Sequence, residues 1–181
     1  MNVKHFDIEG LVLIEPRAFH DDRGFFFESF NENKYREYLG DGIQFVQDNI
    51  SSSKKGVLRG LHFQLPPFAQ GKLVSVVKGG VLDVAVDLRK ESPTYGKHEL
   101  VELTEKNKLQ FWIPPGFAHG FLSLEEDTIF SYKCSNYYSP QHERTILWND
   151  QDLKIEWGID TPIVSDKDRI GEEFRNFVSP F

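Results

Sequence analysis

The sequence is poor in cysteine: Cys134 is the only one, so no disulfide can form within the chain. It has no apolar run near the roughly 20 residues that a membrane-spanning helix needs. Acidic residues outnumber basic ones by 28 to 21, which excludes a general basic surface for nucleic acid. Acids interrupt the apolar residues of the N-terminal segment, a pattern not typical of a secretory signal. We therefore expect a cytoplasmic protein that binds neither membranes nor nucleic acid.

Aromatic residues and short β-forming runs are abundant. The chain has 16 Phe, 6 Tyr and 3 Trp, which suit a stiff apolar core. Apolar runs alternate with Gly, Pro, Asn and Asp clusters about every eight to twelve residues, as in a β-sandwich or barrel. Only Asn33–Leu39 has a helical pattern. We predict one all-β domain over residues 1–181, a double-stranded β-helix of the cupin-like jelly-roll type with an N-terminal strand arm and a ligand site at its mouth.

Three local patterns refine this prediction. Gly79-Gly80 separates two valine-rich runs and predicts a hairpin turn. In the second run, Leu82 and Val84 share one face while Asp83 and Asp87 share the other, as expected for a lined interior. After Pro140 the strand signal weakens, so we expect a loop-rich or helical tail that covers one end of the barrel.

The histidines do not form a good metal site. Metal-binding cupins usually carry two His one residue apart, then a Glu and a later His. This chain has His62, but Gln64 stands where the second His would be, and Lys72 is the first charged residue that follows. His119 occupies the place of the later His. Two imidazoles without a carboxylate or thiolate are a poor site for a divalent ion, so we expect no metal and no cofactor.

The same residues are better suited to proton transfer. A jelly roll would bring the segments of His62, Lys72, His119 and Tyr132 around one barrel. His and Tyr make a credible base and acid pair, and an ammonium group can stabilise an oxyanion. A histidine base also needs an orienting carboxylate; the segment Ser165–Asp168 offers either Asp166 or Asp168, and spacing does not choose between them.

An anionic ligand would need a local basic cluster, and Arg23, Arg59, Lys72 and Lys167 are the candidates. Arg59 lies three residues before His62, so regular alternation would place the two side chains on opposite faces. A β-bulge at Gly60 would re-aim one of them.

Taken together, the ordered motifs resemble one family, the dTDP-4-dehydrorhamnose 3,5-epimerases of the dTDP-rhamnose pathway. The resemblance runs from about residue 10 to residue 171. Its motifs read DDRGFFFESFN, FVQDN, GVLRGLHFQ, QGKLVSVVKGGVLDVAVDLRK, SPTYGK, WIPPGFAHGFL, YKCSNYYSP, HERTILWND and SDKD. It implies a metal-independent jelly roll, usually a homodimer, in the synthesis of lipopolysaccharide or another cell-surface polysaccharide.

The resemblance also implies roles for individual residues. His62 would be the base, Tyr132 the acid on the opposite face of the sugar, Asp168 the partner of His62, and Lys72 the group that faces the C4 oxygen. The remaining residues that would contact the nucleotide sugar are Arg23, Glu28, Gln47, Asp48, Asn49, Arg59, His119, Glu143 and Lys167.

The implied reaction is inversion of C3 and C5 of dTDP-4-dehydro-6-deoxy-D-glucose through enolates, giving dTDP-4-dehydro-L-rhamnose. Two alternatives stay open: an epimerase that inverts one centre only, and a sugar-nucleotide-binding cupin without catalysis. Because Phe25, Phe26 and Phe27 are consecutive, we expect their strand to be covered on both faces. We expect that cover to be a second subunit, to whose site Arg23 and Glu28 would contribute; an interior strand of the same barrel is the alternative.

Overall fold

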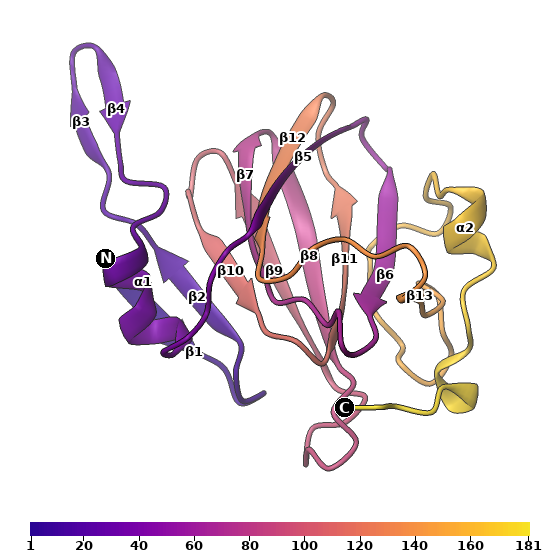
Figure 1. Ribbon diagram of the computed structural model, residues 1–181. Coiled ribbons are helices and arrows are strands. Elements are labelled where there is room, and N and C mark those ends of the chain that lie inside the picture. The colour runs from indigo at the N-terminus through magenta and orange to yellow at the C-terminus, as the bar shows by residue number, and fades with distance from the viewer.

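The computed structural model describes residues 1–181 and consists mainly of two antiparallel β-sheets (Figure 1). One sheet contains, in spatial order, β1 (Asn2–His5), β2 (Val12–Glu15), β10 (Gln110–Ile113), β7 (Lys72–Lys78), β12 (Thr128–Cys134) and β5 (Gln47–Ser53). The other contains β13 (Glu143–Thr145), β6 (Leu58–Gln64), β11 (Phe117–Ser123), β8 (Gly80–Asp87) and β9 (His98–Thr104). This arrangement confirms the predicted all-β fold of the jelly-roll type.

The turn at Gly79-Gly80 differs from the prediction. β7 pairs with β10 and β12, whereas β8 pairs with β9 and β11, so the turn passes from one sheet to the other and does not close a hairpin. Gly79 has φ +78°, and a Cβ there would lie 2.6 Å from Oγ1 of Thr128. The prediction failed because a glycine pair indicates a sharp turn but not which strand each neighbour will join.

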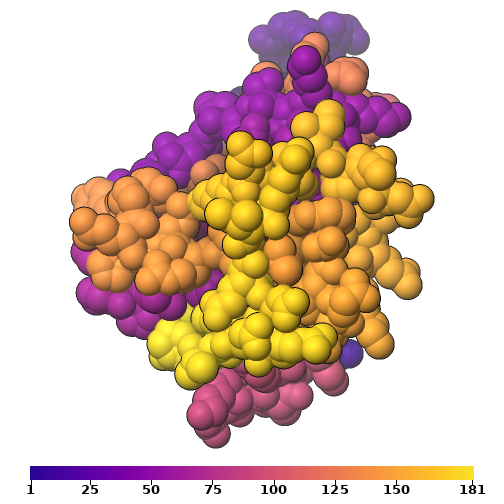
Figure 2. Space-filling view, turned by 90° about the vertical axis from the view of Figure 1, so that its right-hand side faces the viewer, coloured from indigo at the N-terminus to yellow at the C-terminus, as the bar shows by residue number.

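Apolar residues of β8 are buried on both faces. Val81 and Ala85 belong to the core between the two sheets. Val84 and Val86 belong to a second core, formed with tail residues that include Trp157. The expected tail is therefore present, but it packs on the outer face of the five-stranded sheet and not over one end of the barrel (Figure 2). It contains two short helices, α2 (Asp166–Arg169) and η1 (Phe174–Asn176).

The N-terminal region forms an arm that extends from the barrel (Figure 1). Its strands, β3 (Phe19–Asp21) and β4 (Gly24–Phe26), pair only with each other. Phe25 and Phe26 are 58% and 67% exposed in the single chain, so the alternative of an interior strand is wrong. The strand is also shorter than the run of three Phe suggested. The Lys108 ammonium lies 4.3 Å from the centre of the Phe25 ring, but Phe25 and Phe26 stay mostly exposed within this chain.

Helix α1 (Glu32–Leu39) follows the arm, one residue longer than predicted. The Asn31 side chain caps its first turn by accepting a hydrogen bond from the backbone N–H of Lys34. Tyr35 anchors the helix on the six-stranded sheet, where its hydroxyl donates to Oε1 of Gln110 at 2.6 Å. None of the helices is long and apolar enough to cross a membrane.

Candidate active site

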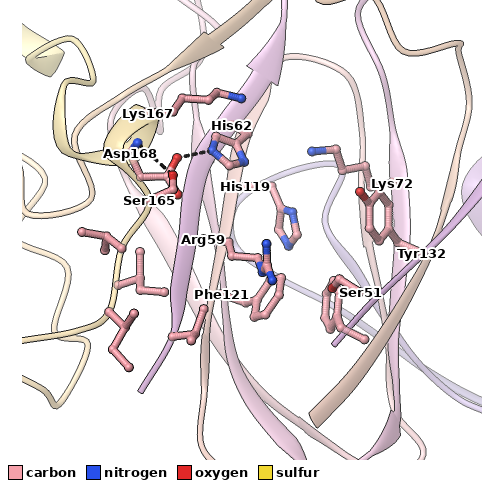
Figure 3. Close-up of a pocket in the computed structure, with 15 residues that line it drawn as sticks. Ser51, Arg59, His62, Lys72, His119, Phe121, Tyr132, Ser165, Lys167 and Asp168 are labelled. Carbon is pink, nitrogen blue, oxygen red and sulfur yellow. Dashed lines mark hydrogen bonds and ion pairs between the residues drawn. The ribbon is translucent and has the colours of Figure 1, made fainter. Parts of the chain in front are cut away.

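A cavity of about 490 Å³ opens between the two sheets beside the tail (Figure 3). It is lined from strands β5, β6, β7, β11 and β12 and from the segment around α2. Seven predicted site residues lie around it: Arg59, His62, Lys72, His119, Tyr132, Lys167 and Asp168. The barrel thus brings together the base, acid and ammonium candidates that are far apart in the sequence.

His62 and Asp168 form a close pair on one wall of the cavity. Nε2 of His62 lies 2.6 Å from Oδ1 of Asp168, which is only 2% exposed. Ser165 caps α2 by accepting a hydrogen bond from the backbone N–H of Asp168, which fixes this carboxylate at the cavity. Burial alone would raise the pKa of Asp168, but hydrogen bonds from His62, Ser165 and the Gly60 backbone keep it below its usual range. Asp166, the other candidate, is exposed.

The bulge at Gly60 explains how Arg59 and His62 face the same cavity. His119 pairs with His62 while Phe121 pairs with Arg59, so β6 has one more residue than β11 over this stretch. Gly60 has φ +135°, and a Cβ there would lie 2.5 Å from Cα of Gly120. The predicted re-aiming by a bulge is therefore confirmed, and only glycine fits this position.

Lys72 and Tyr132 lie on the other wall, contributed by the six-stranded sheet (Figure 3). Burial lowers the pKa of the Lys72 ammonium, against the opposing charge of Glu143. Burial likewise raises the pKa of the Tyr132 phenol, which keeps its proton available for donation. His62 and Tyr132 therefore approach the cavity from opposite sheets, with an ammonium group close to both.

His119 forms a second histidine–carboxylate pair, with Asp83. Its Nε2 lies 2.9 Å from Oδ2 of Asp83, and both side chains are buried. Burial lowers the pKa of His119, and the Asp83 carboxylate opposes this effect. Asp83 was not predicted as a site residue, although its place on the inner face of a valine-rich strand was a usable signal.

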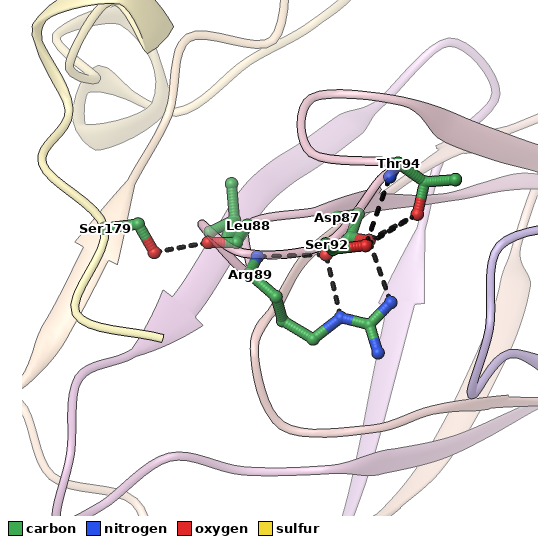
Figure 4. A network of polar contacts seen from close by, with 6 residues as sticks. All are labelled: Asp87, Leu88, Arg89, Ser92, Thr94 and Ser179. Carbon is green, nitrogen blue, oxygen red and sulfur yellow. Dashed lines mark hydrogen bonds and ion pairs between the residues drawn. The ribbon is translucent and has the colours of Figure 1, made fainter.

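Asp87, the other acid on that face of β8, does not join the site. It accepts hydrogen bonds from Ser92, Thr94 and the Arg89 guanidinium at the end of the strand (Figure 4). The hydroxyl of Ser179 in the C-terminal tail donates to the neighbouring carbonyl of Leu88. This network fixes the loop after β8, so Asp87 has a structural role.

A second hollow of about 270 Å³ adjoins the cavity and shares His62, Lys72 and Tyr132 with it. Its wall includes Glu143, which accepts from the Tyr138 hydroxyl at 2.8 Å and pairs with Lys167 at 2.5 Å. Burial would raise the pKa of Glu143, but these two partners hold it below its usual range.

The amides of Gln47 and Asn49 bond to each other at 3.0 Å and also line this hollow. Asp48, between them on β5, points to the opposite face and pairs there with Lys133.

Two predicted residues are not at the cavity. Arg23 lies in the arm and pairs with Asp21 at 2.6 Å. Glu28 contacts Asn31 and Lys34 near the start of α1. Within one chain, neither residue lines the cavity or the adjoining hollow.

The arrangement suits proton transfer at a carbon next to a carbonyl group. A histidine paired with a carboxylate can take a proton, and a phenol on the opposite wall can return one. An ammonium group near both can hold an oxyanion. No group of three or more His, Cys, Asp or Glu side chains could hold a metal ion.

Comparisons with known proteins agree with this geometry. A profile of the family described as dTDP-4-dehydrorhamnose 3,5-epimerase matches residues 5–176. The Shigella flexneri protein of that name is 54% identical over 174 residues, 96% of each chain. A Legionella pneumophila 3,5-epimerase, solved with dTDP-4-keto-L-rhamnose, is 48% identical with a TM-score of 0.94, covering 98% of this chain and 94% of its own. The corresponding enzyme of Elizabethkingia anophelis is also 48% identical, with a TM-score of 0.92 and 97% of each chain covered. The chain belongs to the dTDP-4-dehydrorhamnose 3,5-epimerase family.

Proposed function

We propose that this enzyme inverts C3 and C5 of dTDP-4-dehydro-6-deoxy-D-glucose and produces dTDP-4-dehydro-L-rhamnose. The observation that carries the proposal is the approach of His62 and Tyr132 from opposite sheets, with Lys72 close to both. Inversion of a carbon centre needs a proton to leave on one face of the sugar and to return on the other. The product would enter the synthesis of a cell-surface polysaccharide.

The C3 and C5 protons are acidic because both carbons are next to the C4 carbonyl. His62 removes one of these protons, and the electron pair moves onto O4 to give an enolate. Lys72 stabilises the charge on O4. Tyr132 then donates a proton to the same carbon from the opposite face. Before the sequence repeats at the other centre, His62 releases its proton to solvent and Tyr132 takes one up from solvent through the open cavity. Each step moves only protons, so the chemistry itself calls for no redox cofactor.

Asp168 stabilises the imidazolium that forms when His62 accepts a proton, because its carboxylate lies 2.6 Å from Nε2. The remaining groups bind the nucleotide sugar. Arg59 and Lys167 supply positive charge and hydrogen-bond donors at the cavity, and His119 supplies a polar side chain. Gln47, Asn49 and Glu143 supply polar groups in the adjoining hollow. Asp48 acts through the backbone of β5, because its side chain points away.

The functional unit in this proposal is a homodimer with composite sites. Support comes from the arm, whose Phe25 and Phe26 stay mostly exposed in their own chain. Exposed apolar surface of this kind marks a contact with another chain. The arm of one subunit would carry Arg23 and Glu28 to the site of the other. The cytoplasmic location remains a prediction from the sequence.

Subunit mixing tests the composite site. Mixing inactive His62→Ala with inactive Arg23→Ala should restore activity after subunit exchange, because one site of each heterodimer then has no lesion. Mixing His62→Ala with Asp168→Ala is the control, since both lesions affect the site of their own subunit. A monomeric mass at assay concentration, or equal activity in both mixtures, would contradict the dimer proposal.

The reaction itself is tested by NMR of the product formed in D₂O, because each inverted carbon acquires deuterium. Deuterium at both C3 and C5 with inverted configuration supports the proposal. Inversion at one centre identifies a monoepimerase, and no exchange identifies a binding protein. His62→Asn should abolish exchange at both carbons, with a loss of at least about 10²-fold.

A further inference from the structure

Ser51 has an unusual hydroxyl group. Its Oγ is the one buried side-chain nitrogen or oxygen in the structure that has no hydrogen-bond partner. Buried polar groups in folded proteins are nearly always paired, so an exception needs an explanation. This exception lies on the wall of the cavity that holds His62, Lys72 and Tyr132 (Figure 3).

The other inward-facing side chains of β5 are all satisfied. Gln47 and Asn49 bond to each other, and Oγ of Ser53 accepts from Nε of Arg59 at 3.1 Å. The alternate residues of the strand, including Ser52, are exposed on the opposite face. Ser51 is therefore the only member of the inner row that lines the cavity and has a polar group without a partner in the protein.

The surroundings of Ser51 fit the apolar face of a sugar. Ser51 pairs in register with Phe130, whose ring stacks on Phe121 with centroids 4.2 Å apart. The C–H groups of a deoxyhexose pack well against such rings. The Arg59 guanidinium bonds to the neighbouring Ser52 and Ser53, so the diphosphate is the alternative that the test must separate. Tyr132 pairs with the residue two positions before Ser51, a separation of about 7 Å along a strand, which is close to the width of a hexose with its hydroxyl groups.

We propose that Ser51 binds a hydroxyl group of the hexose and contributes to the choice of sugar. This inference rests on the proposed function, because it takes the hexose to lie between His62 and Tyr132. The Ser51 hydroxyl can donate one hydrogen bond and accept others. A sugar that carries a hydroxyl at this point satisfies it, and a sugar without one leaves both partners unpaired.

The test uses two ligands that the enzyme cannot epimerise: dTDP-6-deoxy-D-glucose, which has no keto group, and dTDP, which has no hexose. In Ser51→Ala, the Kd for dTDP-6-deoxy-D-glucose should rise about 3- to 10-fold, which is the usual loss of affinity when one hydrogen bond is removed. The Kd for dTDP should stay within twofold. Ser52→Ala is the matched control on the exposed face of the same strand and should bind both ligands normally. Ser51→Cys, which keeps the shape of the side chain with a slightly larger atom that bonds weakly, should resemble Ser51→Ala.

The unliganded protein gives a second readout with the opposite sign. Removing a buried, unpaired hydroxyl relieves its desolvation cost, so the Tm of Ser51→Ala should rise by about 2–4 °C. Equal weakening of both ligands would assign the contact to the diphosphate and overturn the hexose assignment. If Ser51→Ala binds dTDP-6-deoxy-D-glucose as tightly as the wild type does, and the wild-type enzyme epimerises its substrate in D₂O, the Ser51 inference is overturned and the proposed function stands. A wild-type protein without turnover would instead overturn the proposed function.

Discussion

Replacing Asp168 with Asn should slow turnover about 10²- to 10³-fold with little change in KM. The substitution keeps the size of the side chain and leaves an oxygen to bond with His62, but removes its charge. Two unit charges about 4 Å apart interact by about 4 kcal/mol at an effective dielectric constant of 20, which corresponds to about 10³-fold in rate. Because the His62 side chain is 25% exposed to solvent, the effect should reach the lower part of this range.

Proton exchange measured by NMR in D₂O gives the rate at each carbon separately. The loss should be similar at C3 and C5, because one imidazolium serves both centres. Asp166→Asn is the matched control: it removes a charge from the same helix α2, but at an exposed position. If Asp168→Asn exchanges both protons within threefold of the Asp166→Asn rate, the carboxylate does not support the base and the reasoning is wrong.

Four further outcomes are expected. In Tyr132→Phe, inversion should be slow while exchange at the first carbon continues, because only the donor is lost; NMR that shows wild-type inversion would refute its role. Burial lowers the pKa of Lys72 below the usual 10.5, so the ammonium form, and activity with it, should decline as pH rises toward that value. Lys72→Arg should move the decline to higher pH, and a pH profile that does not move would contradict this. EDTA-treated, dialysed enzyme should keep full activity, and a loss that one divalent ion reverses would show a metal requirement. For Asp87, burial raises the pKa but the hydrogen bonds from Arg89, Ser92 and Thr94 hold it below 3.8, so its stabilisation is present above about pH 4 and is lost as pH falls through the lowered value. Asp87→Asn should therefore reduce the free energy of unfolding by about 3 kcal/mol at neutral pH, and urea denaturation should show the difference from wild type shrinking in acid.

The sequence alone determined the local features of this protein. Period-2 alternation with turn residues at regular intervals predicted the strands, because side-chain direction along a strand depends only on neighbouring residues. The single cysteine excluded a disulfide, and Gln64 and Lys72 argued against a cupin metal site. The bulge at Gly60 was also foreseeable, since two side chains three residues apart had to reach one cavity.

Only the tertiary structure decided what depends on long-range pairing. It made Gly79-Gly80 a passage between sheets, because strand partners are chosen by packing across the whole barrel. It brought Asp168 to His62 across 106 positions of sequence; the resemblance had implied this pair, but spacing alone did not choose between Asp166 and Asp168, because the tail docks through contacts that no local pattern encodes. It also left Ser51 without a partner beside three satisfied neighbours on β5. Whether a buried hydroxyl is satisfied depends on every element that surrounds it, and those elements come from distant parts of the chain.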